Sequence, residues 1–442
     1  MLDKDPPEIF VGIVFFIWRV SEFAFFGFVY GTKFAFRAVG RLVFRAGPSL
    51  PQLAGEFVTE LFESLGATFV KVGQVMSSRP DIFSEEVTQP LKRLQDQVAP
   101  FDTKLIPGLV REAYGKPLEE VFAEFDFRPI SAASVAHVHR ARLRDGRDVA
   151  VKIRRPGQLR RVKYDLLVLK LFARVLDLLP GMYLISLPQM VDDFTSNIYR
   201  QLDFSLEAAN NRRFRKNFEK LPGVKFPVLV DELCTDTILV MEFLAGLQKI
   251  GHITLSKEER QRGARAALQA LYRMCFTDGF VHADMHPGNV FFREGGEFVV
   301  LDLGLITELG QEDFRNLTEF FFAMVTNDGR TCAKVVYESS PFRAKHFNAP
   351  RFEEEMAGLI SKYSTARSGD FEVSGFTTEL FDTQRKHGVQ NRASFATTII
   401  ALIVFEGITK ALDPELDFQA EGRKYFAEAL GRRAQVQAAA RA

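Results

Sequence analysis

Cysteine is scarce in this chain. It occurs three times, at Cys234, Cys275 and Cys332, and the three are widely spaced with no Cys-x-x-Cys pair. An odd number of isolated cysteines argues against a disulfide framework and against a cysteine-based zinc site. The composition therefore predicts a protein that faces a reducing compartment, either the bacterial cytoplasm or the interior of an organelle.

An excess of charge of one sign is also missing. Lys and Arg total 57 against 56 Asp and Glu, which leaves a formal net charge of +1. No overall field draws such a chain to nucleic acid, so we expect no nucleic-acid partner. Apolar residues make up 47% of the 442 positions, which is enough for a large core. The length fits two lobes with extensions better than one small domain.

The N-terminus has no uninterrupted apolar run of the length that spans a bilayer. Residues 1–8 are net acidic and no small-residue cleavage site follows, which argues against a secretory signal. The apolar runs Ile9–Trp18 and Phe23–Tyr30 are separated by Arg19 and Glu22. The whole stretch can cross a membrane only if Arg19 and Glu22 pair across one helical turn.

A basic stripe follows this apolar stretch. Four cations recur at i, i+4 spacing on a helix whose other faces are apolar: Lys33, Arg37, Arg41 and Arg45. This pattern is typical of a helix lying on an anionic membrane surface, and we predict membrane association through residues 1–46. The alternative is a polar face on a helix that packs against the body of the protein.

Hydrophobic periodicity predicts an α+β chain. Helices are expected over most of 47–125, over 159–179 and 187–218, and through most of the chain after Ser256. Strands are expected at 138–143, 149–153, 226–230 and 237–243, with a hairpin at 290–292 and 298–301. The apolar run 395–405 is too short to span a bilayer and is interpreted as a buried helix. This order of elements is that of a protein-kinase fold.

The strongest motif runs from His282 to Asn289 and is followed by Leu301-Asp302-Leu303-Gly304. An aspartate five residues before an asparagine, in a loop that precedes a hairpin, has the spacing of a kinase catalytic loop. Asp284 could accept a proton from a hydroxyl group or orient a water molecule. Asn289 and Asp302 offer the oxygen ligands that Mg²⁺ prefers. The simpler alternative is a polar turn beside a hairpin.

A second motif is the strand Val149-Ala150-Val151-Lys152. A lysine on a buried strand is costly unless it is paired, and kinases use such a lysine to hold the α- and β-phosphates. Glu207 is the candidate counter-ion, and a snorkelling surface lysine is the alternative. Upstream, small residues in 131–138 replace the glycine-rich loop of kinases, and alanine makes that loop stiffer. The histidine pairs 137/139 and 282/286 could ligate a metal, but each lies in a stretch that the kinase motifs explain better.

These motifs resemble the UbiB/AarF family of atypical kinases over about residues 65–412. Three segments carry the resemblance: Lys71-Val72-Gly73-Gln74 with Ser78-Arg79-Pro80-Asp81 and Leu94-Gln95-Asp96, the alanine-rich Ala132-Ala133-Ser134, and His282-Ala283-Asp284-Met285-His286-Pro287-Gly288-Asn289. The first is that family's KxGQ segment.

The resemblance implies a two-lobed kinase-like fold with an added N-terminal helical subdomain. The expected divisions are 1–46 for the membrane-associating helices, 47–125 for the KxGQ extension, 126–246 and 247–425 for the two lobes, and 426–442 for a tail. Lys71 and Gln74 would have a regulatory role and point into the nucleotide pocket. The nucleotide would be contacted by the loop, the strand lysine and an adenine-binding hinge, at Ala132, Ala133, Ser134, Val135, Lys152, Met241, Glu242, Phe243 and Leu244. ATP or ADP with Mg²⁺ is the implied cofactor set, and membrane lipids, quinone-like lipids and quinone-biosynthesis proteins are the implied partners.

The sequence departs from the family pattern in three places. Gln201-Leu202-Asp203 stands where an acidic residue usually begins the segment, His137 replaces a glutamine, and Asp302 is followed by Leu303 rather than phenylalanine. These changes favour altered turnover with retained nucleotide and Mg²⁺ binding. The main hypothesis is an ATPase or small-molecule kinase that supports ubiquinone-type lipid synthesis at a membrane. The alternatives are a non-catalytic, nucleotide-gated lipid chaperone and a protein kinase acting in trans, against which the KxGQ segment argues because it would block peptide access.

Overall fold

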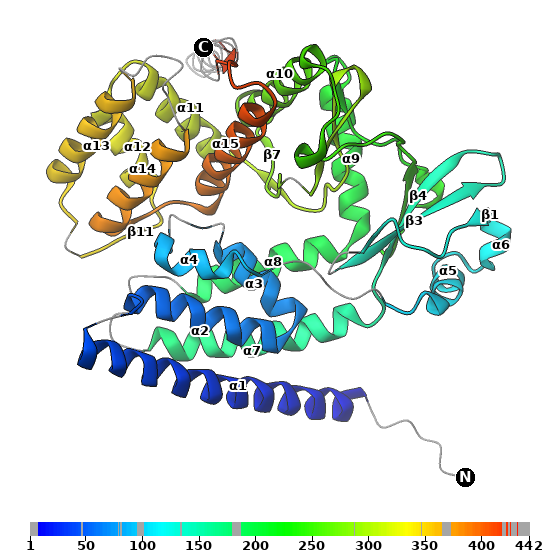
Figure 1. Cartoon of the computed structure of the whole chain (residues 1–442), viewed down its shortest axis with the longest axis horizontal. Coiled ribbons are helices and arrows are strands. Elements are labelled where there is room, and N and C mark those ends of the chain that lie inside the picture. Colours follow the sequence, from blue (N-terminus) through cyan, green and yellow to red (C-terminus); the bar gives the residue numbers. More distant parts are fainter. Residues whose placement is uncertain are drawn as a thin grey trace, which may run out of the picture. The chain divides into compact units, whose positions relative to one another are not determined.

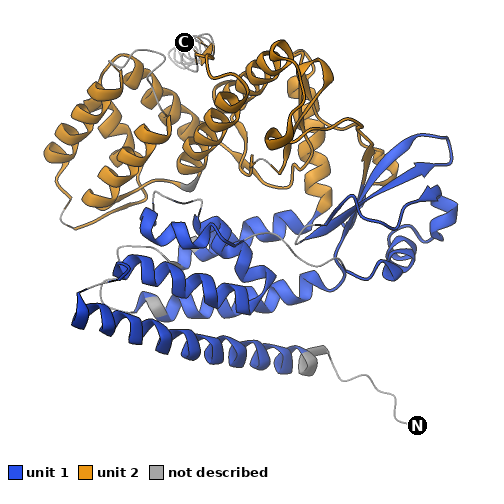
Figure 2. Ribbon diagram, viewed as in Figure 1, with its two compact units in different colours: residues 1–203, 235–239 blue, residues 204–234, 240–442 orange. Residues whose placement is uncertain are grey.

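The chain forms two compact units in the computed structural model (Figure 2). Unit 1 comprises Met1–Asp203 and Thr235–Leu239, and unit 2 comprises Phe204–Cys234 and Val240–Ala442. The structure describes residues 8–45, 47–77, 79, 82–94, 101–132, 135–178, 187–286, 288–345, 347–364, 373–417, 421–422, 425 and 431. The domain divisions predicted above, which follow the family, stay a prediction.

Unit 1 is built from a helical group and a small sheet (Figure 1). Its helices are α1 (Glu8–Phe44), α2 (Leu50–Leu65), α3 (Ala67–Ser77), α4 (Glu85–Leu91), α5 (Ile106–Tyr114), α6 (Leu118–Val121), α7 (Gln158–Asp177) and α8 (Leu187–Leu202). Helix α1 packs along α2 and α7, and the shared core includes Phe23, Phe62 and Phe69. The Ser49 side chain caps α2 by accepting a hydrogen bond from the backbone N–H of Gln52.

The predicted basic stripe of α1 packs against the body of unit 1. Lys33 forms an ion pair with Glu60 at 2.6 Å, and Arg37 forms one with Glu56 at 2.5 Å. Arg41 donates hydrogen bonds to the carbonyls of the α1–α2 turn. The cations at 33, 37 and 41 therefore follow the alternative interpretation, because their partners lie within the protein. The residues that α1 exposes are instead largely apolar, including Phe28 at 72% and Phe36 at 83% exposure.

The sheet of unit 1 has the strand order β1-β3-β4-β6, with β2 paired to β3. The strands are β1 (Phe122–Phe125), β2 (Ser131–Ala132), β3 (Ala136–Leu143), β4 (Asp148–Arg154) and β6 (Ile238–Glu242), the last of which begins in unit 1. The β3–β4 hairpin turns at Asp145-Gly146 as predicted, and Val138 pairs with Lys152. The first strand begins earlier than expected, at Phe122.

Unit 2 is mainly helical. Its helices are α9 (Phe204–Phe218), α10 (Lys257–Arg273), α11 (Gln311–Val325), α12 (Gly329–Ser339), α13 (Ala349–Ser364), α14 (Val373–His387) and α15 (Ala393–Leu412). Its short strands are β5 (Val224–Lys225), β7 (Phe280–His282), β8 (Val290–Arg293), β9 (Glu297–Val300), β10 (Ile306–Glu308), β11 (Phe342–Arg343) and β12 (Val389–Gln390). The predicted hairpin is confirmed as β8–β9, and β5 joins it in parallel.

Two further predictions of secondary structure were wrong in detail. The helix expected over 187–218 is two helices, α8 and α9, separated at Asp203. The strand expected over 226–230 is only an isolated bridge between Leu229 and Met241. Pro227 has no backbone N–H to give to a ladder, which explains why the apolar run does not form a regular strand.

Two helices in the described part of the chain are long and apolar enough to cross a membrane, within Gly12–Phe44 of α1 and Ser394–Leu412 of α15. Helix α15 contributes Ile399, Leu402 and Phe405 to the core of unit 2, each 2% exposed or less. The helix is buried as predicted, but the prediction that it is too short to span a bilayer was wrong, because the apolar run 395–405 extends into a longer apolar helix, Ser394–Leu412. Helix α1 is mostly unburied and keeps its apolar side exposed.

Candidate functional site

The loop that carries Asp284 is held between two short strands of unit 2. Helix α10 begins with a capping box of Ser256 and Glu259 and ends in a π-helical turn, Met274–Asp278. Gly279 then adopts a left-handed conformation (φ 58°), which glycine accepts at little cost. Strand β7 follows and pairs with β10, so the loop 283–289 starts from a fixed sheet edge.

His282 connects the two acidic motifs of unit 2. Its Nδ1 accepts a hydrogen bond from the backbone N–H of Asp284 at 3.1 Å, and its Nε2 donates to the backbone carbonyl of Asp302 at 2.6 Å. The imidazole is 1% exposed, and this burial lowers its pKa. A neutral ring with the proton on Nε2 satisfies both contacts. The predicted base and the predicted metal ligand are thus set on two sides of one ring.

Asn289 is oriented by the same loop. Its amide nitrogen donates to the backbone carbonyl of Asp284 at 2.9 Å and lies 3.5 Å from the Asp284 carboxylate. This use of the NH₂ group leaves the amide oxygen as the atom with which Asn289 could bind a cation. The Asp302 carboxylate accepts the backbone N–H of Gly304 at 3.0 Å, which fixes its direction.

Asn210 supports this arrangement from α9. Its side-chain amide donates to the backbone carbonyl of Leu303 at 2.9 Å. Asn210 is not among the residues predicted from the sequence. Its contact crosses 93 positions of the chain, so no local pattern could have indicated it.

The histidines of the motif serve the loop itself. His286 Nδ1 accepts the backbone N–H of Gly288 at 3.0 Å, and its Nε2 lies 3.8 Å from the Asp284 carboxylate. A side chain at Gly288 would collide with this ring, because an added Cβ would lie 2.7 Å from His286 Cε1. Among the described residues, no group of three or more His, Cys, Asp or Glu side chains is arranged to hold a metal ion. A cation bound by Asn289 and Asp302 would complete its shell with phosphate oxygens and water.

The predicted adenine hinge, Met241–Leu244, lies at the end of β6 in unit 2. Met241 and Leu244 are buried, while Glu242 is half-buried. The Glu242 carboxylate accepts the backbone N–H of Val228 at 2.7 Å and pairs with Lys225 at 2.7 Å. The backbone N–H of Glu242 donates to the carbonyl of Val228 at 2.8 Å, so both the side chain and the N–H of Glu242 are engaged within unit 2.

Lys152 and its proposed partners belong to different units. Lys152 lies in unit 1, half-buried between buried Val151 and Ile153 on β4. Glu207 lies in the first turn of α9 in unit 2 and is 2% exposed. The pairing of Lys152 with Glu207, and the convergence of Lys152 with Asp302, stay predictions.

The KxGQ segment forms part of α3 in unit 1. Gly73 is needed for close packing, since an added Cβ would lie 2.2 Å from Leu94 Cδ1 and 3.1 Å from Phe62 Cδ2. Gln74 donates its side-chain amide to the carbonyl of Leu94 at 3.2 Å, and Lys71 is half-buried. The predicted direction of Lys71 and Gln74 toward a nucleotide stays a prediction. Ser78, Pro80, Asp81, Gln95 and Asp96 lie outside the described residues.

The alanine-rich loop joins β2 to β3. Ala132 is the last residue of β2 and pairs with His137, and the carbonyl of half-buried Val135 accepts the backbone N–H of Arg155 at 2.9 Å. Ala133 and Ser134 lie outside the described residues.

His137, one of the departures from the family pattern, is a buried packing residue. Its ring stacks on Phe101 with 3.9 Å between centroids, and its Nε2 accepts the Phe101 backbone N–H at 3.2 Å. Burial, together with Arg155 and His139, lowers the pKa of His137 to about 4. No local pattern predicts this contact, because Phe101 lies 36 positions away from His137 in the chain.

Comparison with known proteins agrees with these motifs. The model of the ABC1 atypical kinase-like domain matches residues 93–336. The chain is 32% identical over 362 residues to "Probable protein kinase UbiB" of Pseudomonas fluorescens (strain Pf0-1), which covers 80% of this chain and 68% of that protein. This chain belongs to the UbiB family of ABC1 atypical kinase-like proteins. Its UbiB relative in Vibrio cholerae serotype O1 (strain M66-2) is 30% identical, over 82% of this chain and 68% of that protein.

The kinase-like fold of the UbiB family also appears among solved structures. The structure of the Rv3197–erythromycin complex from Mycobacterium tuberculosis aligns with a TM-score of 0.58 and 21% identity. The alignment covers 88% of this chain and 97% of that chain. At this identity the likeness shows the fold alone, and it confirms the α+β kinase-like class predicted from the sequence.

Proposed function

We propose that this UbiB-family protein binds ATP with Mg²⁺ and transfers or hydrolyses the γ-phosphoryl group in support of ubiquinone-type lipid synthesis at a membrane. The observation that carries the proposal is the His282 bridge. One buried ring orders the backbone of Asp284 and of Asp302 at 3.1 and 2.6 Å. Phosphoryl transfer depends on such positioning and on charge neutralisation more than on covalent catalysis.

Each residue then has a defined task. Asp284 accepts the proton of the attacking hydroxyl group or water, while the bond between the γ-phosphorus and the β,γ-bridging oxygen breaks and ADP leaves. Asn289 and Asp302 would hold Mg²⁺, which would neutralise the charge that develops on the phosphate. Lys152, with Glu207 as its counter-ion, binds the α- and β-phosphates. The alanine-rich loop covers the phosphates, and the backbone of Met241–Leu244 binds adenine.

The membrane part of the proposal is supported by α1. The exposed side of α1 carries many large apolar residues, whereas single exposed apolar residues are ordinary on a protein surface. Arg19 is 2% exposed, binds Asp165 at 2.6 Å and donates to the carbonyl of Leu65 at 3.0 Å. Arg19 also pairs with Glu22, which is the pairing that a membrane-spanning helix would need. Removing α1 from unit 1 would leave buried charges uncompensated, so we place α1 on the membrane surface rather than across it.

The link to quinone lipids rests on the relatives. They carry the name UbiB, which ties the family to ubiquinone synthesis. Quinone-biosynthesis proteins and an isoprenoid or quinone-like lipid are accordingly the proposed partners.

The test replaces the proposed metal ligand. Asp302→Asn keeps the size and the hydrogen-bond acceptor of the side chain but removes its charge. We expect ATP hydrolysis in the presence of Mg²⁺ to fall by about 100-fold or more, since metal-ion stabilisation contributes several kcal/mol. Asp231→Asn is the matched control, because Asp231 is an exposed partner of Arg212 at 2.7 Å in the same unit. Hydrolysis that survives Asp302→Asn would contradict the assignment.

The second candidate function is a nucleotide-gated lipid chaperone without turnover. Gln201, a neutral amide where the family has an acidic residue, is the observation that favours it. A protein whose melting temperature rises with Mg²⁺–ATP, but which releases no phosphate even with vesicles present, would establish this alternative.

A further inference from the structure

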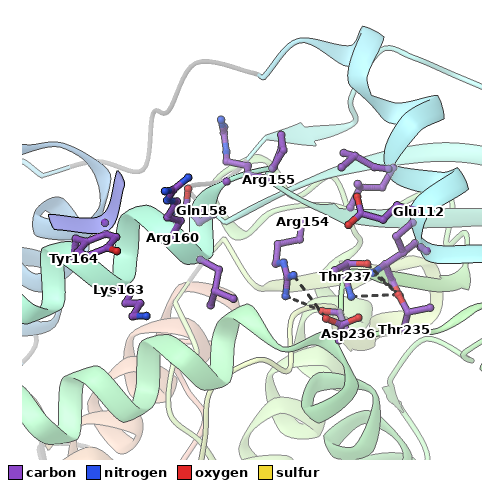
Figure 3. A pocket seen from close by; sticks show the side chains of 18 of the residues that line it. Glu112, Arg154, Arg155, Gln158, Arg160, Lys163, Tyr164, Thr235, Asp236 and Thr237 are labelled. Carbon is purple, nitrogen blue, oxygen red and sulfur yellow. Dashed lines mark hydrogen bonds and ion pairs between the residues drawn. The ribbon is translucent and has the colours of Figure 1, made fainter. Parts of the chain in front are cut away.

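Unit 1 contains a cavity of about 1050 Å³ at the N-terminal end of α7 (Figure 3). Helices α1, α5 and α7, the end of β4 and the segment 235–238 line it, and all of these belong to unit 1. The polar side chains on its wall are Glu112, Arg154, Arg155, Gln158, Arg160, Lys163, Tyr164, Thr235, Asp236 and Thr237. None of the functions assigned above uses this cavity.

The cations of the cavity divide into two kinds. Arg154 and Arg155 are used by the fold: Arg154 donates to the carbonyls of Leu202 at 2.7 Å and Asp236 at 3.2 Å, and the half-buried Arg155 guanidinium lies 5.9 Å from the Phe101 ring centroid. Arg160 and Lys163 stand one helical turn apart at the start of α7, and both are exposed. Figure 3 shows these two side chains on the same stretch of α7 beside Tyr164. The N-terminal end of this 20-residue helix adds a favourable dipole for an anion at the same place.

The part of the wall contributed by α1 is apolar, lies beside Tyr164 of α7, and continues into the exposed side of α1. Gly12 lies so close to α7 that an added Cβ would be 2.3 Å from Tyr164 Oη. Ile13, also in the wall, is 53% exposed. The next outward residues of α1 are apolar as well: Val14, Ile17 and Trp18.

Helix α7 extends this apolar surface away from the cavity. It exposes Leu167, Leu171, Val175 and Leu178, which recur at helical spacing. Phe172, 39% exposed, contacts Phe23 of α1 with 4.7 Å between ring centroids. The exposed side of α7 therefore borders α1, and the cationic cavity lies at the edge of an apolar face made by both helices.

We propose that this cavity binds the phosphate headgroup of an anionic phospholipid in the membrane on which α1 lies. Arg160 and Lys163 bind the phosphate oxygens, and the acyl chains remain in the bilayer against Ile13 and the outward residues of α1. A soluble anion could be bound by the cations alone. A phospholipid has both a phosphate and acyl chains, so it also explains why the cations lie beside the apolar face. The inference rests on the membrane association proposed above and is independent of the nucleotide chemistry.

The experiment measures vesicle binding by the full-length protein. One set of vesicles contains phosphatidylcholine alone, and in the other part of it is replaced by phosphatidylglycerol. We expect tighter binding to the anionic vesicles, and we expect R160Q/K163Q to weaken that binding by about 10-fold or more while leaving binding to neutral vesicles unchanged. K116Q/R128Q is the matched control, because it removes the same charge from exposed positions of unit 1 outside the cavity. This control should keep the preference for anionic vesicles, and both variants should keep basal ATP hydrolysis.

Four results would overturn the inference. Equal binding to both kinds of vesicle, or an equal loss in K116Q/R128Q, would show apolar or diffuse charge attraction and leave the membrane association intact. Binding of inorganic phosphate that is lost in R160Q/K163Q, without any effect of vesicle headgroup, would identify free phosphate as the ligand. Failure of the unmodified protein to bind either vesicle would remove the membrane part of the proposed function as well.

Discussion

At the scale of single residues, two buried histidines show how this chain uses imidazole as a structural connector. His282 joins the backbone of Asp284 to that of Asp302, and His137 joins β3 to the backbone of Phe101. Burial lowers the pKa of both rings. The neutral ring of His282 uses one donor and one acceptor on backbone groups, His137 uses its acceptor, and protonation would destroy the acceptor in each case.

His137 makes the stability of the protein sensitive to acid. Its pKa is about 4 in the folded state, against about 6.5 when exposed, so the unfolded chain takes up a proton first as the pH falls. Stability from this group is therefore complete above pH ~6.5 and declines down to pH ~4. His137→Gln keeps an acceptor for Phe101 but cannot titrate. We expect its thermal midpoint to change less between pH 7 and pH 5 than that of the unmodified protein.

A matched variant separates this effect from the general effects of acid. His252 is exposed in unit 2, and His252→Gln should reproduce the unmodified pH profile. An unchanged profile in His137→Gln would show that other groups, such as His139 or His282, control the acid sensitivity.

At the scale of elements, most of the fold could be predicted from periodicity and turn residues. The β3–β4 hairpin, the β8–β9 hairpin and the buried helix α15 formed where the pattern placed them. Periodicity could not show which neighbouring element each face of a helix contacts. The apolar and basic sides of α1 were both predicted. The sequence did not show that Glu56 and Glu60 of α2 form ion pairs with the basic side.

The same limit applies to the candidate site. Asp284, Asn289 and Asp302 could be proposed from the sequence because spacing within one loop and hairpin carries their signal, and their roles stay predictions. Asn210 and His137 were not recognised, because each acts on a backbone group distant in the chain. The end of α8 and the start of α9 on either side of Asp203 were also not predicted, because no proline or glycine marks the boundary.

Helix α3 provides an element-scale prediction. Gly73→Ala inserts a methyl group at 2.2 Å from Leu94 Cδ1, in a packed core. We expect a loss of about 1–2 kcal/mol in unfolding free energy, because overpacking outweighs the better helix propensity of alanine. Adding Leu94→Ala should remove the collision, so the double variant should be less unstable than the sum of the two changes.

Gly31→Ala on α1, where nothing lies within 4 Å, should instead stabilise by about 0.5–1 kcal/mol. Chemical denaturation measures all four, and a stabilising Gly73→Ala would contradict this account of the KxGQ glycine.

At the scale of the whole molecule, the proposed nucleotide chemistry requires residues from both units. Lys152 belongs to unit 1, and Asp302 and Glu207 belong to unit 2. If Lys152 and Asp302 bind the same triphosphate and its metal, their contributions to Mg²⁺–ATP affinity depend on each other. A ligand that binds only the folded protein at 100 times its Kd adds about 2.7 kcal/mol of stability, which a melting experiment detects readily.

A double-mutant cycle tests this dependence. We expect Lys152→Met and Asp302→Asn each to abolish most of the rise in melting temperature caused by Mg²⁺–ATP, and the double variant to lose little more than either single one. Removing Mg²⁺ with a chelator should reduce the rise in melting temperature of the unmodified protein as much as Asp302→Asn does. It should cause no further loss in the Asp302→Asn variant. Strictly additive losses would mean that the lysine and the aspartate act at separate places, because two groups on one phosphate–metal cluster cannot contribute independently. In that case the His282 bridge would still order the loop of unit 2, but it would no longer support a shared nucleotide site.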